Sequence, residues 1–419
     1  MTTTLPEDPM TTHDSEPLHY QDATALAALI ATKQVSSREV VQAHLDRIAE
    51  INPKINAIVT LVADDALRTT DAADAAVASG VELGPLHGVP ITVKDSIDTA
   101  GVLTQGGSKV FGGRVPAADG TAVARFKAAG GILLAKTNLP EFSAWTETDN
   151  LVTGRTNNPW NLDRTPGGSS GGESAAIAAG MSPIGIGSDV AISVRGPAAF
   201  TGIAALKATH GRIPFTGHLA PMTSAWFHVG PMARTVRDIA LGYSLLSGHD
   251  GVDGYAVHAK DTDSARTRIA GQTIRVGWVS DDAFGPVDPE ITAAIADAAG
   301  RLADLGCHVE RIDAPFLRDT DALTADMTFF YSQLVPHVKA LAAGREDELF
   351  STGRGIVAME DPTFAHLHAA RETQEALRSA FAGYFRDYDV LLCPVTPMTA
   401  PPHGSRSSSS TVSLCRGST

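Results

Sequence analysis

Residues 164–176 read RTPGGSSGGESAA, so that four glycines surround two serines and an alanine-rich segment follows them. Glycine lets the backbone adopt conformations that other residues avoid, and it lets the chain approach a ligand closely. The alanine-rich segment predicts a helix, and free N–H groups at a helix start favour an anion or a developing oxyanion. The stretch is therefore a candidate for a reactive loop around which the rest of the fold is arranged.

Other interpretations of this stretch compete with that one. A phosphate-binding P-loop needs a lysine directly after its glycines, and none follows here. Gly168 to Gly172 formally matches a G-x-S-x-G nucleophile elbow centred on Ser170, but an elbow follows a buried strand, and NLDRTP precedes it here. A glycine–serine loop that merely caps a helix is the favoured interpretation of the stretch in isolation.

Strands and helices alternate on both sides of this loop. Short β-branched or apolar runs predict strands over 91–94, 132–136, 183–187, 273–279, 308–312 and 389–393, the last of them buried. Helices are predicted after Asp22, after a capping box at 36–39, and over 64–78, 121–129, 173–179, 234–246, 289–305, 320–343 and 363–386. This alternation predicts an α/β fold whose mixed, mostly parallel central sheet is covered by helices on both faces.

The two ends of the chain differ in amino-acid composition from the middle. Residues 1–16 are polar and predict a flexible segment, and residues 17–403 form the predicted domain. Residues 404–419 are serine-rich and predict a disordered tail. The abrupt change in composition there fits a fragment end or a change of reading frame.

Composition excludes several classes of protein. The 419 residues include 33 basic and 47 acidic side chains, a net charge of −14 that argues against nucleic-acid binding. Three cysteines with no C-x-x-C spacing argue against a disulfide framework and predict a reducing cytoplasm. No uncharged apolar run reaches about 18 residues, so no membrane span is predicted. We expect a monomer or a homodimer.

Several motifs beyond the loop occur in a fixed order. They are Gly88-Val89-Pro90-Ile91-Thr92-Val93-Lys94-Asp95, Lys136-Thr137-Asn138-Leu139-Pro140-Glu141-Phe142, the segment from Gly187 to Phe200, Leu206-Lys207-Ala208-Thr209-His210-Gly211-Arg212, and the segment from Gly230 to Asp238. Together with the loop they resemble the amidase signature family over roughly residues 20–400. The resemblance implies the amidase signature fold and a Ser-cisSer-Lys triad that hydrolyses amides.

Carried over by motif, the resemblance implies that Ser193 is the nucleophile, Ser169 the bridging serine and Lys94 the base. It implies supporting roles for Gly168, Ser170, Asp189 and Arg195. The chemistry is consistent with these roles, because a serine hydroxyl is a weak nucleophile without an adjacent base. Lysine acts as a base only when neutral, and burial lowers its pKa. We expect Asp95 to point away from Lys94, because its charge would oppose that shift.

The resemblance places an oxyanion hole at the backbone N–H groups of Val190, Ala191, Ile192 and Ser193. Here the chain departs from the family, which has two glycines where Ala191 and Ile192 stand. Backbone donors survive this change, but isoleucine is stiff and disfavours a positive φ. Either the backbone there suits isoleucine, or the oxyanion hole is reshaped and the acyl side of the pocket is narrowed.

The expected substrate is a small amide or carbamate. Phe142, Trp145 and Leu151, with the later Trp226 and Phe227, are candidates for lining an apolar pocket, which would favour aryl or alkyl amides; aromatic core packing is the alternative. No H-E-x-x-H motif or cysteine cluster suggests a metal, and no cofactor is expected. Two other functions stay open: an amidotransferase subunit for charged-tRNA amidation, and a non-catalytic relative whose oxyanion hole is disabled by Ile192.

Overall fold

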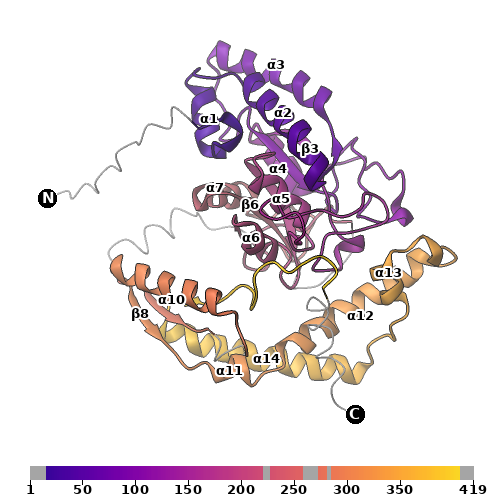
Figure 1. Cartoon of the computed structure of the whole chain (residues 1–419), viewed down its shortest axis with the longest axis vertical. Coiled ribbons are helices and arrows are strands. Elements are labelled where there is room, and N and C mark those ends of the chain that lie inside the picture. The colour runs from indigo at the N-terminus through magenta and orange to yellow at the C-terminus, as the bar shows by residue number, and fades with distance from the viewer. Residues whose placement is uncertain (1–15, 220–226, 258–271, 281–284, 406–419) are drawn as a thin grey trace.

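The computed structural model describes residues 16–219, 227–257, 272–280 and 285–405 (Figure 1). The segments predicted to be flexible at 1–16 and disordered at 404–419 therefore lie almost wholly outside the described residues, as does Trp226. The strands are β1 (Ile58–Leu61), β2 (Pro90–Lys94), β3 (Ile132–Thr137), β4 (Ile184–Asp189), β5 (Ala204–Ala205), β6 (His228–Ala233), β7 (Arg275–Trp278), β8 (His308–Arg311) and β9 (Val390–Leu392).

The helices begin and end close to the predicted positions. The α-helices are α1 (Ala23–Ala31), α2 (Ser37–Ile55), α3 (Ala63–Ser79), α4 (Thr121–Ala128), α5 (Gly171–Ala178), α6 (Arg195–Thr201), α7 (Val236–Leu246), α10 (Pro289–Asp304), α11 (Pro315–Arg318), α12 (Ala322–Ala342), α13 (Ser351–Val357) and α14 (Phe364–Asp387). Short 3-10 helices are η1 (Leu18–Tyr20), η2 (Lys109–Phe111), η3 (Glu141–Ser143) and η4 (Glu346–Glu348).

The central sheet is mixed, and its middle is parallel. Its strand order is β1-β3-β2-β4-β6-β5, with β2 parallel to both β3 and β4. Antiparallel pairing joins the outer strands to this middle: β1 to β3, β6 to β4 and β5 to β6. The parallel middle matters for function because β2 and β4 end at the same edge of the sheet.

Helices cover both faces of this sheet, as the alternation of elements predicts. On one face, Ile91, Val93, Ile184 and Ile186 pack in a core cluster with side chains of α1, α4 and α7. On the other face, α5 lies so close to β4 that a side chain on Gly185 would collide with Glu173. The predicted α/β architecture with a mixed sheet between helical layers is thus confirmed.

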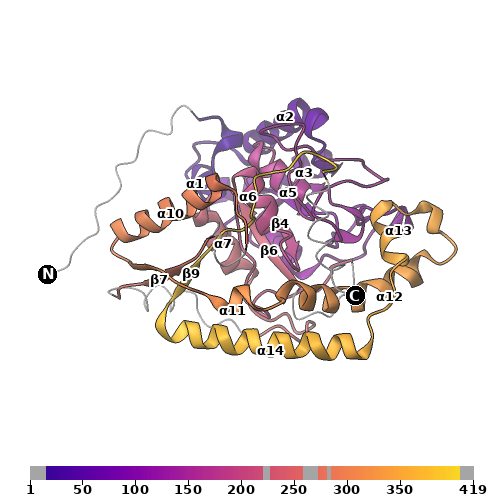
Figure 2. The ribbon, with the colours of Figure 1, turned by 60° about the horizontal axis from the view of Figure 1, so that its bottom comes forward.

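The chain beyond residue 272 adds a separate small sheet, which the strands predicted over 273–279, 308–312 and 389–393 did not distinguish from the central sheet. Strand β7 lies between β8 and β9 and pairs in parallel with both. Helix α10 packs against β8, and α12 packs along α14 (Figures 1 and 2). The last strand was predicted to be buried, but Val390 is 43% exposed because β9 lies at the edge of this sheet.

Local signals at helix starts explain where several elements begin. Ser36 and Glu39 form the predicted capping box of α2. The helix predicted from residue 234 begins instead at Val236, because Thr235 caps it by accepting a hydrogen bond from the Asp238 N–H. The residues before it extend as β6, a strand that includes Pro231 and was not predicted.

The final described segment returns across the core. The N–H of Thr165 donates to the carbonyl of Pro401 at 3.1 Å, and the N–H of His403 donates to the carbonyl of Asp163 at 3.2 Å. In Figure 1 this yellow segment crosses in front of the magenta core. It brings residues 403–405 next to the long loop that precedes α5. Within the described residues, no helix combines the length and apolar character needed to cross a bilayer.

Candidate active site

The parallel middle of the sheet gathers polar side chains at one edge. Lys94 is the last residue of β2, and Ser188 and Asp189 end the neighbouring strand β4. Ser169 lies in the loop that enters α5. Because the carboxyl ends of parallel strands lie together, residues far apart in the chain meet at this edge.

Lys94 is the centre of this cluster. Its side chain is fully buried, and its Nζ lies 2.7 Å from the Oγ of Ser169 and 3.1 Å from the Oγ of Ser188. Burial lowers the pKa of Lys94 to about 7, although the negative charges of Asp189 and Glu173 oppose this shift. A large share of Lys94 is therefore neutral near pH 7, with a lone pair able to accept a proton from a hydroxyl group.

A buried carboxyl group lies beside this lysine. Glu173, in the first turn of α5, accepts hydrogen bonds from the hydroxyls of Thr92 and Thr137. Burial raises the pKa of Glu173 to about 7 against those hydrogen bonds and the charges of two nearby lysines. Gly185 is required opposite it, since an added Cβ would lie 1.8 Å from the Glu173 Oε1.

The loop before α5 holds Ser169 in a defined orientation. The peptide bond between Gly168 and Ser169 is cis. A Cβ on Gly168 would lie 2.5 Å from the Trp145 carbonyl, so glycine is needed at this close approach. The N–H of Ser170 donates to the Ser193 carbonyl at 3.0 Å, which holds the Ser193 turn against this loop.

Ser193 lies in the turn between β4 and α6 and is partly exposed. Its Oγ makes no hydrogen bond to Ser169 or Lys94 in the described part of the chain. The structure thus brings Lys94 and Ser169 into direct contact, and it joins Ser193 to them through the backbone of Ser170.

The turn from Val190 to Ser193 has unused backbone donors. Among the described residues, none of its four N–H groups donates a hydrogen bond to another protein atom. Neither Ala191 nor Ile192 has a positive φ, so the backbone at both positions suits a residue other than glycine. The Ile192 side chain lies against Gly196 in α6, where an added Cβ would be 3.0 Å from the Ile192 Cγ1.

Asp189 and Arg195 form an ion pair that holds this turn in place. Arg195 donates to both carboxylate oxygens of Asp189 at 3.0 and 2.9 Å, and the Val194 N–H donates to the same carboxylate at 3.0 Å. Burial alone would raise the pKa of Asp189, but the hydrogen bond and charge of Arg195 outweigh it and hold the pKa below its usual value. Asp189 is therefore ionised and fixes both ends of the turn.

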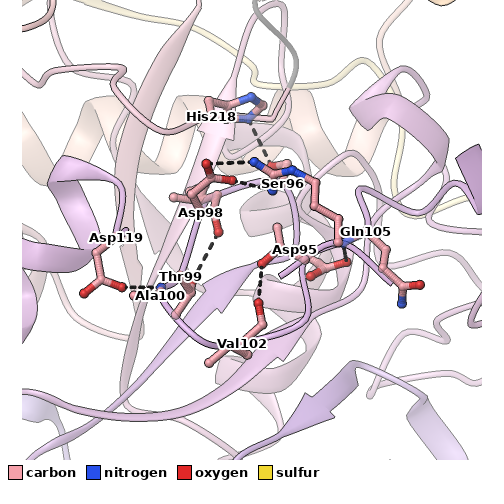
Figure 3. A network of polar contacts seen from close by, with 12 residues as sticks. Asp95, Ser96, Asp98, Thr99, Ala100, Val102, Gln105, Asp119 and His218 are labelled. Carbon is pink, nitrogen blue, oxygen red and sulfur yellow. Dashed lines mark hydrogen bonds and ion pairs between the residues drawn. The ribbon is translucent and has the colours of Figure 1, made fainter. Parts of the chain in front are cut away.

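A histidine that sequence reasoning missed, His218 from the segment after β5, lies against the loop that follows β2. The Nε2 of His218 lies 3.0 Å from the Oγ of Ser96 and 2.9 Å from the Oγ of Ser188, which itself contacts Lys94. Figure 3 shows His218 above this loop, where it contacts Ser96. His218 lies 122 residues from Ser96, and no motif in its neighbourhood signals the contact.

Asp95 turns away from Lys94, as expected. Its carboxylate accepts a hydrogen bond from the Gln105 N–H at 3.0 Å (Figure 3). Burial raises the pKa of Asp95 to about 6, and the positive charge of Lys136 acts in the opposite direction.

The predicted apolar pocket is only partly assembled. Trp145 lines a cavity of about 650 Å³. Its other walls come from Glu147, Asp149 and Arg155 in the same loop, from residues between Tyr331 and Met359, and from the returning segment at 403–405. Phe142 and Phe227 are instead buried in a core cluster that also contains Val190. Leu151 is 44% exposed and does not line this cavity. The structure therefore separates the residues that were predicted to share a pocket.

Within the part of the chain that the structure describes, no three His, Cys, Asp or Glu side chains are grouped as metal ligands would be. The arrangement is a lysine, several hydroxyl groups and a set of free N–H donors. These are the elements of nucleophilic acyl chemistry.

Known proteins are similar to this chain in sequence and in fold. The model of the Amidase family matches residues 39–417. A glutamyl-tRNA(Gln) amidotransferase subunit from Acidothermus cellulolyticus is 36% identical over 413 residues, covering 92% of this chain and 81% of the relative. The solved structure of 6-aminohexanoate cyclic dimer hydrolase has a TM-score of 0.83 at 31% identity, covering 92% of this chain and 81% of that one. A bacterial aryl acylamidase of the amidase signature family has a TM-score of 0.82 at 29% identity, covering 93% and 82%.

Proposed function

The chain belongs to the amidase family, and we propose that it is a serine hydrolase that cleaves the C–N bond of amides with apolar substituents. The observation that carries this proposal is the contact of 2.7 Å between the fully buried Lys94 Nζ and the Ser169 Oγ. A buried lysine whose pKa is about 7 can act as a base, and its direct partner is a hydroxyl that can relay a proton.

In the proposed reaction, the Ser193 Oγ attacks the substrate carbonyl and forms an acyl-enzyme. Its proton passes to Ser169, whose own proton passes to the Nζ of Lys94. The N–H groups of the Val190–Ser193 turn stabilise the negative charge on the substrate oxygen. The relay then runs in reverse to protonate the leaving amine, and water activated by the same relay releases the acid.

The cavity beside Trp145 supports an apolar substrate. Trp145, Tyr331, Phe350, Ile356 and Met359 give it a large apolar wall beside its polar residues, and its volume of about 650 Å³ lies in the range of small-molecule sites. Its wall residue Tyr331 also packs against the core cluster that includes Val190, the first residue of the proposed oxyanion turn. Aryl or alkyl amides fit such a cavity, and aryl carbamates present the same groups.

A subunit of an amidotransferase is the second candidate function. The similarity to the glutamyl-tRNA(Gln) amidotransferase subunit from Acidothermus cellulolyticus favours it. Such a protein would release ammonia from glutamine, a small polar amide that would leave the apolar wall of the cavity without contacts.

We further propose that the enzyme works without a cofactor, as a single domain over residues 17–403, in the cytoplasm and as a monomer or homodimer. Its three cysteines suit a reducing compartment. Light scattering of the purified protein measures the oligomeric state.

The test is hydrolysis of a small anilide, a matching aryl carbamate and glutamine by the wild type and by Ser193→Ala. Intact mass after treatment with a fluorophosphonate reports the nucleophile. Turnover of the anilide and labelling that both vanish in Ser193→Ala support the proposal, and the ratio of anilide to carbamate rates sorts amidase from urethanase. Turnover of glutamine alone favours the amidotransferase. A folded wild type with neither turnover nor label refutes the hydrolase and leaves the non-catalytic relative.

A further inference from the structure

Two cations hold the carbonyl groups of the turn before Ser193. The Lys207 Nζ donates to the carbonyl of Val190 at 2.6 Å. The Arg195 Nη2 donates to the next carbonyl, that of Ala191. Lys207 lies two residues after β5. In the sequence it follows the turn, whereas the Ser169 loop precedes it. The family resemblance implies a supporting role for Arg195, but Lys207 was not among the predicted site residues.

Holding a carbonyl fixes the direction of the N–H that follows it. In a planar trans peptide unit, the C=O and the next N–H point in opposite directions. Lys207 therefore directs the N–H of Ala191 away from itself, and Arg195 does the same for the N–H of Ile192. Both N–H groups donate no hydrogen bond within the described residues, so both remain available to a ligand.

We propose that Lys207 is a positioning residue for the oxyanion site, and that it acts by orienting the peptide unit between Val190 and Ala191. This inference rests on the proposed function. A charge-assisted hydrogen bond to a carbonyl is stronger than a neutral one, and it polarises the peptide unit so that its N–H becomes a better donor. Lys207 thus orients the Ala191 N–H and makes it a stronger hydrogen-bond donor, without contacting the substrate itself.

The surroundings of Lys207 favour this contact. Burial lowers the pKa of Lys207, and the negative charge of Asp189 opposes that change. Asp326, on α12, also interacts with Lys207, Asp189 and Arg195. The ammonium group therefore donates to the Val190 carbonyl within the favourable electrostatic field of Asp189 and Asp326.

The fixed carbonyls also account for the residues in the turn. A pair of glycines leaves a turn free to adopt many conformations, whereas Ala191 and Ile192 restrict it. With two carbonyls held from outside and no positive φ, the turn keeps a single orientation of its donors.

The experiment compares Lys207→Met and Lys207→Arg with the wild type on the anilide substrate. Loss of a single oxyanion donor costs about 10²–10³ in kcat, and misorienting one costs less, so we expect Lys207→Met to lower kcat by roughly tenfold to a hundredfold. KM stays within about twofold, because the substrate carbonyl carries little charge before attack. Lys207→Arg restores most of the lost rate. Lys127→Met, which removes a partly exposed lysine paired with Asp119, is the matched control and keeps the wild-type rate.

Binding of a boronic acid that mimics the tetrahedral intermediate separates an oxyanion effect from a structural one. We expect its affinity to fall by the same factor as kcat/KM in Lys207→Met. If kcat of Lys207→Met is unchanged, or if only KM changes, the inference is overturned. The proposed function stands in that case as long as the wild type hydrolyses the anilide. If Lys207→Met does not fold, Lys207→Ala with added propylammonium takes its place: rescue of kcat supports positioning, and failure of rescue in a folded variant overturns it. A wild type without turnover overturns both.

Discussion

Replacing Lys94 with arginine tests whether the buried amine acts as the base. An ordinary lysine with a pKa of 10.5 is neutral in about one molecule in 3,000 at pH 7, whereas a pKa of about 7 leaves half of the molecules neutral. Burial therefore raises the fraction of lysine that is neutral by roughly 1,500-fold, which corresponds to about 4 kcal/mol. A guanidinium group does not deprotonate in proteins, so Lys94→Arg keeps a donor to Ser169 and removes the acceptor.

We expect kcat/KM of Lys94→Arg to fall by at least roughly 10³ at pH 8, with no recovery at higher pH. In the wild type, kcat/KM should rise with pH through about 7, because Lys94 must lose its proton before it can accept one. The assay is anilide hydrolysis between pH 5.5 and 9.5, with thermal melting to show that each variant is folded.

Lys127→Arg is the control, since it keeps the ion pair with Asp119 and should leave the profile unchanged. The larger guanidinium group in the Lys94 site will also lower the melting temperature, because overpacking costs about 1–3 kcal/mol. The reasoning fails if a folded Lys94→Arg keeps more than a tenth of the activity. It also fails if the wild-type profile is flat across this pH range.

Other perturbations probe the surroundings of Lys94. Glu173→Gln removes a charge that raises the pKa of Lys94, so the rising limb of kcat/KM should move to lower pH; a shift to higher pH would contradict this. Gly185→Ala should lower the free energy of unfolding by about 1–3 kcal/mol in urea, because its Cβ would lie 1.8 Å from the Glu173 Oε1. Gly300→Ala, in α10 with open space around it, should instead raise the free energy of unfolding by about 0.5–1 kcal/mol. Ile192→Gly should not raise kcat/KM, since the φ there is already compatible with isoleucine; a tenfold gain would show that its side chain blocks the site.

Local sequence patterns predicted the elements that carry the candidate site. The β-branched run before Lys94 and the apolar run before Ser188 became β2 and β4, and the glycine–serine loop became the entry to α5. These features depend on a few neighbouring residues, so one sequence is enough to reveal them.

Features that depend on distant contacts were not predictable in the same way. The alternation of strands and helices does not show which strands pair, so the separate sheet of β7, β8 and β9 was missed. Pro231 hid β6, because proline is uncommon inside a sheet. Leu151 was grouped with Trp145 on proximity in sequence, but it lies outside the cavity, most of whose wall comes from residues 331–359 and 403–405. The contact of His218 with Ser188 likewise depends on the folded arrangement alone.

The cavity walls and the polar cluster come from different parts of the chain. Lys94, Ser169 and Ser193 lie in the first half, whereas most of the wall beside Trp145 is supplied by residues 331–359 and 403–405. Under the proposed function, substitutions in the cavity wall can change which substrate binds without changing the residues of the proton relay. Chimeras that exchange the segment of α12 and α13 between relatives should inherit the selectivity of the donor and the pH profile of the recipient. Because the two sets of residues are separate in the chain, exchange of one segment can give an enzyme of this fold a new substrate.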